Sequence, residues 1–282
     1  MVPNFSALNE HFQWALREDV GEGDHSARAC IPAEASGKAH LLIKQEGIVA
    51  GIALAQHLFS LFEPQAEFEP LLHDGDRVSV GDIAFVVKGP SRSLLTIERL
   101  VLNYMQRLSG IATLSARYAA AVAGTKAKVL DTRKTTPGLR ILEKWAVQLG
   151  GCYNHRMGLY DMVMLKDNHI DFCGGIAQAI QTTHEYLKNN GLNLNIEIEV
   201  RNEEELDQVL RTGGVQRIML DNFSPERTLQ AVSKIGGQYE IESSGGITLE
   251  TIGRYAECGV DYISVGALTH QIGSLDMSLK AF

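Results

Sequence analysis

Residues 131–140 read DTRKTTPGLR and contain three cations, in a chain whose formal net charge is −8. Within residues 126–169, eight Lys or Arg and four Asp or Glu leave a local net charge of +4. A cationic stretch in an acidic protein indicates a site for a small anionic ligand. The alternative is a solvated positive face, but the cations lie beside Gly, Pro, Thr and His instead of forming Lys/Glu helical stripes.

Two further motifs add basic side chains to this region. NHRMG contains His155 and Arg156, and LKDNH contains Lys166 and His169. The planar fork of arginine suits a carboxylate or a phosphate, whereas lysine acts as a point charge. Four or more cations around one site predict a ligand with several negative charges, such as a dicarboxylate together with a phosphorylated sugar. His169 is expected to be structural, with a partner in the preceding turn.

Acidic residues stand at the ends of two successive apolar runs. Side chains alternate along a strand, so Glu197 and Glu199 of IEIEV share one face. Glu199 and Asp221 end neighbouring runs, and two converging carboxylates suit a hard divalent cation, with Mg²⁺ bound to phosphates as the usual case. An ion pair with nearby Arg or Lys explains these two residues equally well.

Glycine-rich motifs follow the last two apolar runs. SSGGI occupies residues 243–247, and SVGAL occupies residues 264–268. Glycine lets backbone N–H groups approach an anion, and a following helix N-terminus adds a favourable dipole. Because the last two strand loops of β/α barrels often bind phosphate, the two motifs together predict a phosphate monoester site.

These residues are positioned by six apolar runs in the second half of the chain. Each run ends in polar residues, and helical patterns separate the runs. The runs are AKVL, MVML, IEIEV, RIML, YEIE and DYISV. Repeated strand, loop and helix units predict a parallel sheet with its ligand site at the carboxyl ends of the strands. A doubly wound sheet and a β/α barrel both satisfy this pattern. The two carboxylates on one face of IEIEV favour a barrel, with an exposed edge strand as the alternative.

The first half has a different pattern. Residues 37–53 and 71–89 resemble short strands joined by Gly and Asp turns, and residues 54–62 and 94–120 have helical periodicity. These features predict an α+β domain that extends to about residue 110.

Composition excludes several classes of protein. With 282 residues, 45% of them hydrophobic, the chain is long enough for one large or two smaller domains, and no apolar run reaches the roughly 18 residues of a membrane span. The N-terminal residues lack the pattern of a signal peptide, and the four cysteines form no CxxC pair, so we expect reduced thiols and a cytoplasmic location. The acidic balance argues against a nucleic-acid partner.

The motifs together resemble the quinolinate phosphoribosyltransferase family, also called nicotinate-nucleotide pyrophosphorylase (carboxylating). The segments that carry the resemblance, in chain order, are REDVGEGDHSA, ERLVLNYMQRLSGIAT, DTRKTTPGLR, NHRMGLYDMVMLKDNHI, IEIEV, LDNFSPE, ESSGGI and SVGALTH. The resemblance implies an α/β fold with an N-terminal α/β sandwich over residues 1–110, on which the tail 271–282 packs, and an open six-stranded β/α barrel over residues 111–270, the type II phosphoribosyltransferase architecture. It also implies a homodimer and the conversion of quinolinate and 5-phosphoribosyl 1-pyrophosphate to nicotinate mononucleotide, pyrophosphate and CO₂ with Mg²⁺, in NAD biosynthesis.

The resemblance further implies roles for single residues. The quinolinate carboxylates would be held by Arg133, His155, Arg156 and Lys166, with Arg99 reaching the site of the neighbouring subunit. Lys134 and His270 would face pyrophosphate, and Glu199 and Asp221 would engage the ribose hydroxyls and Mg²⁺. The 5′-phosphate would be cradled by Ser244, Gly245, Gly246, Gly266 and Ala267, and Thr132 and Val265 complete the substrate-binding set. Lys134, Lys166, Glu199 and Asp221 are the expected catalytic residues, whereas Arg140 receives no role.

Two other readings remain. A related phosphoribosyltransferase could act on another ring, although the dicarboxylate-sized group of cations favours quinolinate. Alternatively, GDRVSVGDIAFVVKG resembles the hairpins of lipoyl and biotinyl carrier domains, which present a modified lysine at a hairpin tip. Lys88 is the sole lysine of this stretch and is expected to lie away from any tip, which argues against a carrier role.

Overall fold

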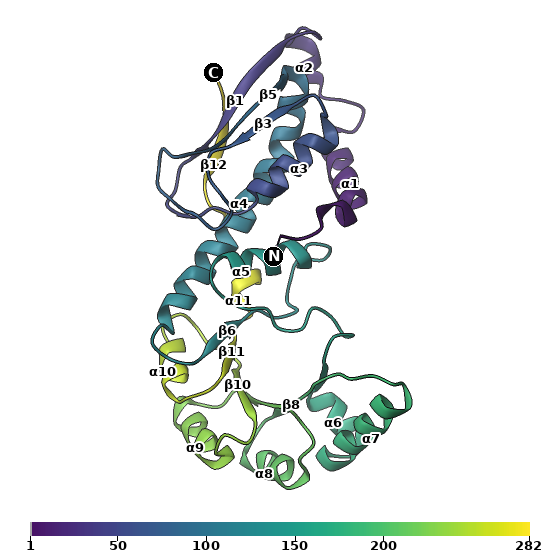
Figure 1. The fold of residues 1–282 in the computed structure, drawn as a ribbon, viewed down its shortest axis with the longest axis vertical. Coiled ribbons are helices and arrows are strands. Elements are labelled where there is room, and N and C mark those ends of the chain that lie inside the picture. Colours follow the sequence, from purple (N-terminus) through teal and green to yellow (C-terminus); the bar gives the residue numbers. More distant parts are fainter. Residues whose placement is uncertain (1) are drawn as a thin grey trace. The chain divides into compact units, whose positions relative to one another are not determined.

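The computed structural model describes residues 2–282, and their contacts form two compact units. The first unit comprises the described residues up to Ala116, together with Thr135–Gly151 and Leu268–Phe282. The second comprises Arg117–Lys134 and Cys152–Ala267. Each unit has its own main sheet, and both sheets are labelled in Figure 1.

The sheet of the first unit is antiparallel and has the strand order β12-β1-β5-β3. Its strands are β1 (Ser36–Ile43), β3 (Glu67–Pro70), β5 (Ile83–Pro90) and β12 (Met277–Ala281). A separate pair contains β2 (Gly47–Ile48) and β4 (Arg77–Val78). Lys88 lies within β5 and forms an ion pair with Glu67 across the ladder, with its Nζ 2.9 Å from the carboxylate. This position confirms that Lys88 is not at a hairpin tip.

Seven helices lie wholly or mostly in the described part of the first unit. They are η1 (Phe5–Leu8), α1 (Asn9–Val20), α2 (His25–Cys30), α3 (Ile52–Phe62), α4 (Ser91–Ala121), α5 (Arg140–Leu149) and α11 (Ala267–His270). Phe59 on α3 and Phe85 on β5 are fully buried, with ring centroids 6.3 Å apart. Among residues 2–282, no helix is long and apolar enough to span a membrane.

The second unit contains a parallel sheet of six strands, as the six apolar runs predict. The strands are β6 (Lys128–Leu130), β7 (Val163–Leu165), β8 (Ile196–Val200), β9 (Arg217–Asp221), β10 (Glu240–Ser244) and β11 (Tyr262–Ser264). Their order is β6-β11-β10-β9-β8-β7, so the strands follow one another around the sheet and β6 and β7 form its two edges. This is the order of an open β/α barrel. Because β8 pairs with both β7 and β9, the edge-strand alternative for IEIEV is wrong.

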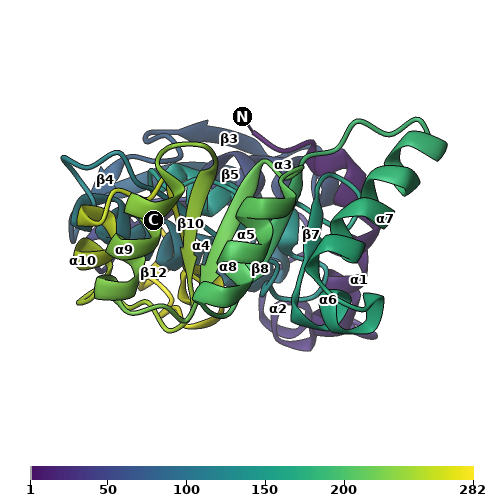
Figure 2. The ribbon, with the colours of Figure 1, turned by 90° about the horizontal axis from the view of Figure 1, so that it is seen from below.

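Helices follow the strands and pack on the outer side of the sheet, as Figures 1 and 2 show for α8 and α9. They are α6 (Asp167–Cys173), α7 (Ile176–Asn189), α8 (Glu203–Thr212), α9 (Pro225–Ile235) and α10 (Ile252–Glu257). Local sequence fixes where they begin. Asn202 caps α8 by accepting the Glu205 N–H at 2.9 Å, and Ser224 caps α9, whose first residue is Pro225.

Candidate active site

The register of the parallel sheet places polar side chains on the inner face of the barrel. Glu199 is paired with Met219, and Met219 with Glu242, and paired residues of parallel strands point to the same side. The alternation of IEIEV adds Glu197 to this face. The inner face is therefore charged, whereas Ile198 and its outward-facing neighbours are buried against the helices.

Lys166 and Glu199 form an ion pair at the carboxyl ends of β7 and β8. Lys166 Nζ lies 3.0 Å from Glu199 Oε2, with the lysine side chain 45% exposed and the glutamate side chain only 9% exposed. The partial exposure of Lys166 leaves it accessible to a ligand. Its backbone N–H donates to His169 Nδ1 at 3.0 Å, which helps to cap α6 and gives His169 the expected partner in the preceding turn.

Asp221 stands at the end of the neighbouring strand β9. Its Oδ2 accepts a hydrogen bond of 2.8 Å from the side-chain amide of Asn222, which has a left-handed backbone with φ of 56°. Burial raises the pKa of Asp221, and the positive charges of Lys166 and Lys134 oppose this shift. The charge of Lys166 thus acts on both Glu199 and Asp221.

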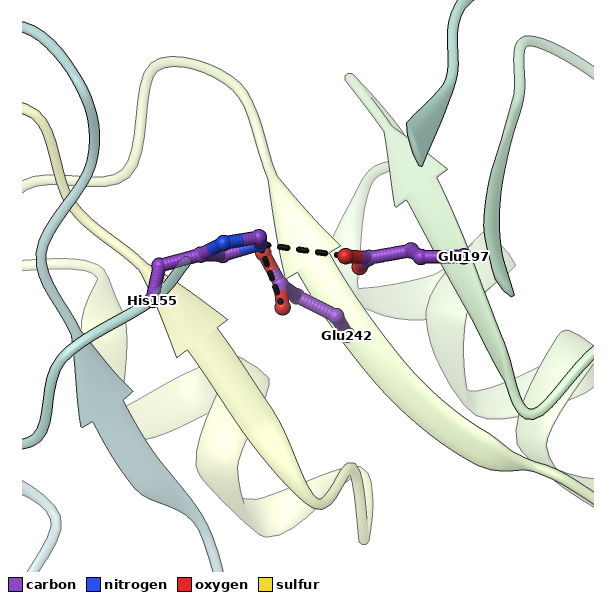
Figure 3. Close-up of side chains that lie close together, drawn as sticks. All are labelled: His155, Glu197 and Glu242. Carbon is purple, nitrogen blue, oxygen red and sulfur yellow. Dashed lines mark ion pairs between the residues drawn. The ribbon is translucent and has the colours of Figure 1, made fainter. Parts of the chain in front are cut away.

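Both the backbone and the ring of His155 anchor the loop that contains it to the barrel. Its backbone N–H donates to the buried carboxylate of Asp131 at 2.8 Å, and its Nδ1 accepts the Arg156 N–H at 2.7 Å. Because Nδ1 is an acceptor, the ring proton resides on Nε2. Figure 3 shows Nε2 directed at two carboxylates, 3.1 Å from Glu197 and 3.6 Å from Glu242.

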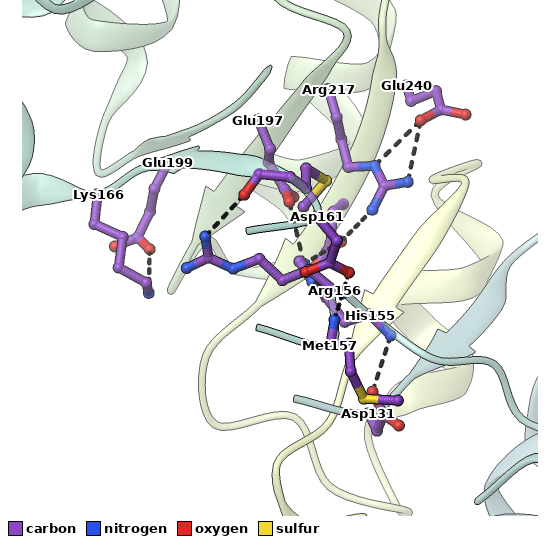
Figure 4. A network of polar contacts seen from close by, with 12 residues as sticks. Asp131, His155, Arg156, Met157, Asp161, Lys166, Glu197, Glu199, Arg217 and Glu240 are labelled. Carbon is purple, nitrogen blue, oxygen red and sulfur yellow. Dashed lines mark hydrogen bonds and ion pairs between the residues drawn. The ribbon is translucent and has the colours of Figure 1, made fainter. Parts of the chain in front are cut away.

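Arg217, the first residue of β9, was not anticipated from the sequence. Figure 4 shows its guanidinium directed at Glu240, with Nη2 3.1 Å from that carboxylate. Its Nη1 is 3.1 Å from Glu242 Oε2, and the guanidinium lies over the ring of Tyr262, 3.8 Å from the centroid. Burial raises the pKa of both Glu197 and Glu242, which are fully buried. Acidic residues alternate in YEIES as they do in IEIEV, so the sequence could have indicated that Glu242 faces the barrel interior.

Among the described residues, one cluster of three side chains and one pair of strand-end carboxylates are considered for metal binding. His155, Glu197 and Glu242 offer one ligand atom each within 4.8 Å of one another, but the guanidinium of Arg217 already supplies the positive charge at Glu242. We therefore describe this group as an ion-pair network.

Glu199 and Asp221 form the second group, and both stand at the open ends of their strands. The ion pair that was the alternative for Glu199 is present, and it engages one oxygen of the carboxylate. The Asn222 amide likewise engages one oxygen of Asp221. The second oxygens provide the hard ligand atoms that Mg²⁺ prefers, so the donor set fits this ion.

The segment after β6 and the loop after residue 154 carry the remaining basic residues. Thr132 Oγ1 accepts the Lys134 N–H at 3.0 Å and turns the chain immediately after β6. Arg133 lies between them. Nη1 of Arg156 donates to the Met162 carbonyl at 3.1 Å, and the Asp161 carboxylate accepts two N–H groups of the same loop.

The glycine pair after β10 has the left-handed backbone that glycine favours, with φ of 96° at Gly245 and 61° at Gly246. A Cβ on Gly245 would lie 2.2 Å from Oδ1 of Asn222, so this position has no room for a side chain. Ser244 accepts the Asn222 N–H through its carbonyl at 2.9 Å. Helix α10 begins only at Ile252, so the expected helix N-terminus does not follow the glycines directly.

The remaining predicted residues are distributed between the two units. Val265 donates its N–H to the Leu130 carbonyl at 2.9 Å, which ties the end of β11 to β6, and Gly266 and Ala267 follow it. Arg99 lies on α4 and His270 ends α11, both within the first unit.

The fold defines an α/β protein with an open β/α barrel and charged side chains at its strand ends. Two family models identify it further. The quinolinate phosphoribosyl transferase C-terminal domain matches residues 111–280, and the corresponding N-terminal domain matches residues 24–109. The chain belongs to the quinolinate phosphoribosyltransferase family, which confirms the resemblance seen in its motifs.

Individual relatives agree with this assignment. The chain is 46% identical over 283 residues to quinolinate phosphoribosyltransferase [decarboxylating] 1b of Nicotiana tabacum, covering 95% of this chain and 80% of that protein. It is 45% identical to the chloroplastic nicotinate-nucleotide pyrophosphorylase [carboxylating] of Arabidopsis thaliana, covering 94% of this chain and 80% of the relative. The crystal structure of NadC from Streptococcus pyogenes superimposes with a TM-score of 0.94 at 41% identity, covering 99% and 98% of the two chains. The predicted fold is therefore confirmed.

Proposed function

We propose that this protein transfers the phosphoribosyl group of 5-phosphoribosyl 1-pyrophosphate to quinolinate and releases pyrophosphate and CO₂. The product is nicotinate mononucleotide, a precursor in NAD biosynthesis. The observation that carries the proposal is the side-by-side arrangement of Lys166, Glu199 and Asp221 at three neighbouring strand ends. Membership in the family and the relatives of the same activity support the choice of substrates.

Quinolinate recognition is assigned to the basic residues of the second unit. Arg133, Arg156 and Lys166 compensate the two carboxylates, and His155, whose ring nitrogens face Glu197, Glu242 and the Arg156 N–H, completes the set by holding the loop that carries Arg156. This assignment rests on charge complementarity, because guanidinium groups bind carboxylates with charge-assisted hydrogen bonds. We assign Arg99 to the site of the neighbouring subunit in a homodimer.

The phosphoribosyl group is assigned to the acidic and glycine-rich strand ends. The 5′-phosphate would accept N–H bonds from the segment containing Gly245 and Gly246, where a backbone without side chains allows close approach. The set for this phosphate is Ser244, Gly245, Gly246, Val265, Gly266 and Ala267. Glu199 and Asp221 would accept hydrogen bonds from the ribose hydroxyls, and Lys134, with the neighbouring Thr132, and His270 would face pyrophosphate.

The chemistry requires placement of charge more than a protein nucleophile. The ring nitrogen of quinolinate attacks ribose C1, and the carboxylates of Glu199 and Asp221 stabilise the positive charge that develops there. Lys134 compensates the departing pyrophosphate. Mg²⁺, when held by Glu199 and Asp221, would neutralise further charge on the phosphates.

Loss of CO₂ follows from the same arrangement. Once alkylated, the ring nitrogen is positive and stabilises the electron pair that departure of CO₂ leaves on the adjacent ring carbon, so no protein group is needed as an electron sink. That carbon then takes a proton from water to give nicotinate mononucleotide. The scheme needs no cysteine, and burial raises the pKa of Cys152 to about 12. The four cysteines form no disulfide, which also supports a reducing compartment, and we propose a cytoplasmic location.

The N-terminal domain is proposed as residues 1–110 with the tail 271–282, and the catalytic domain as residues 111–270.

A direct assay tests the proposal. The protein is incubated with quinolinate, 5-phosphoribosyl 1-pyrophosphate and Mg²⁺, and nicotinate mononucleotide and CO₂ are both quantified. We expect one equivalent of CO₂ per nucleotide and no product when nicotinate replaces quinolinate. Nucleotide formed from nicotinate without CO₂ would favour the related phosphoribosyltransferase, and absence of product from both acids would refute the proposal.

A further inference from the structure

A buried ion pair outside the residues discussed so far connects three segments of the first unit. Arg107 on α4 donates from Nε to Glu143 Oε1 at 2.8 Å, and its Nη2 lies 2.7 Å from the same oxygen. Glu143 on α5 is fully buried, whereas the Arg107 side chain is 30% exposed. A carboxylate in this environment requires a charged partner, so the pair is a fixed part of the fold.

The same guanidinium also binds a loop residue and a residue of α11. Nη2 of Arg107 donates to the hydroxyl of Thr136 at 2.8 Å and to the carbonyl of Thr269 at 3.1 Å. The second oxygen of Glu143 accepts the Thr136 N–H at 3.1 Å. Thr136 is thus held at both its backbone and its side chain. We call Arg107, Glu143, Thr136 and Thr269 the Arg107 brace.

The segments fixed by the brace adjoin two residues assigned to pyrophosphate. Thr136 is two residues after Lys134, and Thr269 immediately precedes His270. We propose that Arg107 is a positioning residue that holds these two segments in the conformation that binds the pyrophosphate group. The inference rests on the proposed function, and it assigns Arg107 a role that acts through Thr136 and Thr269 instead of through contact with substrate.

Arg140 reinforces the first of these segments. Its Nε donates to the Thr135 hydroxyl at 3.1 Å, so the two consecutive threonines of KTTPG are each bound by an arginine. The turn that follows has φ of 81° at Gly138, which lets α5 begin two residues later at Arg140. Arg140, which received no role from the sequence, therefore contributes to the same turn.

The test measures binding of two ligands to matched variants. Isothermal titration calorimetry gives Kd for 5-phosphoribosyl 1-pyrophosphate with Mg²⁺ and, separately, for quinolinate. Arg107→Met should raise the first Kd by about 10-fold or more, because hydrogen bonds to a charged group are lost, and change the second by less than about 2-fold. Arg107→Lys should recover part of the loss, since it retains the charge.

Two further variants separate positioning from general loss of structure. Thr136→Val leaves the buried ion pair intact and should raise the Kd for 5-phosphoribosyl 1-pyrophosphate by about 3-fold. The same substitution should change this Kd little in a protein that already carries Arg107→Met, because the two residues act through one contact. Arg92→Met is the control, because Arg92 lies on the same helix and donates to the carbonyls of Ile31 and Arg28. It should leave both Kd values unchanged.

Several results would overturn the inference. These are equal weakening of both ligands by Arg107→Met, additive effects of the Arg107 and Thr136 variants, or the same pattern from Arg92→Met. The proposed function is judged separately, by product formation in the unaltered protein. If the unaltered protein forms nicotinate mononucleotide and the Arg107→Met variant binds 5-phosphoribosyl 1-pyrophosphate normally, the inference about Arg107 is refuted and the proposed function stands.

Discussion

Replacing Arg217 with methionine should destabilise the barrel strongly at pH 9. The side chain is 15% exposed, and Nη1 lies 3.1 Å from the fully buried carboxylate of Glu242. Removing one partner of a buried ion pair costs about 3–5 kcal/mol, because the other charge stays buried without compensation. Loss of the contact with the Tyr262 ring, 3.8 Å from the guanidinium, adds to this cost. The expected fall in Tm is about 10 °C.

The effect should depend on pH with a defined sign. Burial, together with the charge of Glu197, raises the pKa of Glu242 above its ordinary value of 4.5, and Arg217 opposes the shift. A carboxyl whose pKa is raised in the folded state binds more protons there than in the unfolded state, so stability falls as pH rises above about 4.5. Without Arg217 the pKa of Glu242 rises further. Because the pKa of Glu242 is about 8 in the unaltered fold, the difference in stability between Arg217→Met and the unaltered protein should be small from pH 5 to 7 and grow as pH rises through 8 to 9.

Thermal unfolding followed by circular dichroism at pH 5, 6, 7, 8 and 9 measures this difference. The double variant Arg217→Met with Glu242→Leu removes both charges, and it should recover most of the stability at pH 9 because an apolar pair can replace a buried ion pair. A loss in Tm that is constant across pH, or a double variant no more stable than Arg217→Met, would show that the buried charge of Glu242 does not explain the effect.

Three further substitutions test the proposed site. Arg133→Ala should raise KM for quinolinate by about 100-fold with an unchanged circular dichroism spectrum, and unaltered steady-state kinetics would refute its assignment. Gly245→Ala should lower Tm and raise KM for 5-phosphoribosyl 1-pyrophosphate, because the new Cβ would lie 2.2 Å from Asn222 Oδ1; wild-type values would show that the turn adapts. Lys166→Met should lower kcat/KM by about 100-fold or more but lower Tm less than Arg217→Met, since its side chain is 45% exposed; an equal or larger fall in Tm would favour a structural role.

The six strands of the barrel could be predicted because their signals are local. Each apolar run is short and ends in polar residues, and two of the intervening helices begin at a side-chain cap, Asn202 for α8 and Ser224 for α9. The period of two in IEIEV was sufficient to place Glu197 and Glu199 on one face, and their contacts with His155 and Lys166 confirm it. Arrangements of this kind need no knowledge of distant segments.

Pairings between distant segments could not be derived in the same way. The contact between His155 and Glu242 depends on the strand order, because 87 residues separate the two in the chain. Likewise, no periodicity of residues 135–151 indicates that they belong to the first unit, or that Arg107 contacts Glu143 there. These features follow from the register and packing of whole elements, which composition and spacing do not specify.

The charged interior itself has a physical consequence. Barrel interiors are usually filled with layers of branched apolar residues, which would be more stable than Glu197, Glu242 and Arg217. These residues instead surround Nε2 of His155 with acceptors while Asp131 fixes the backbone of the same residue. The peptide that links His155 to Arg156 is thereby held from both sides, since His155 Nδ1 accepts the Arg156 N–H. A charged interior thus costs stability, but it fixes the orientation of a basic loop in a way that apolar side chains could not.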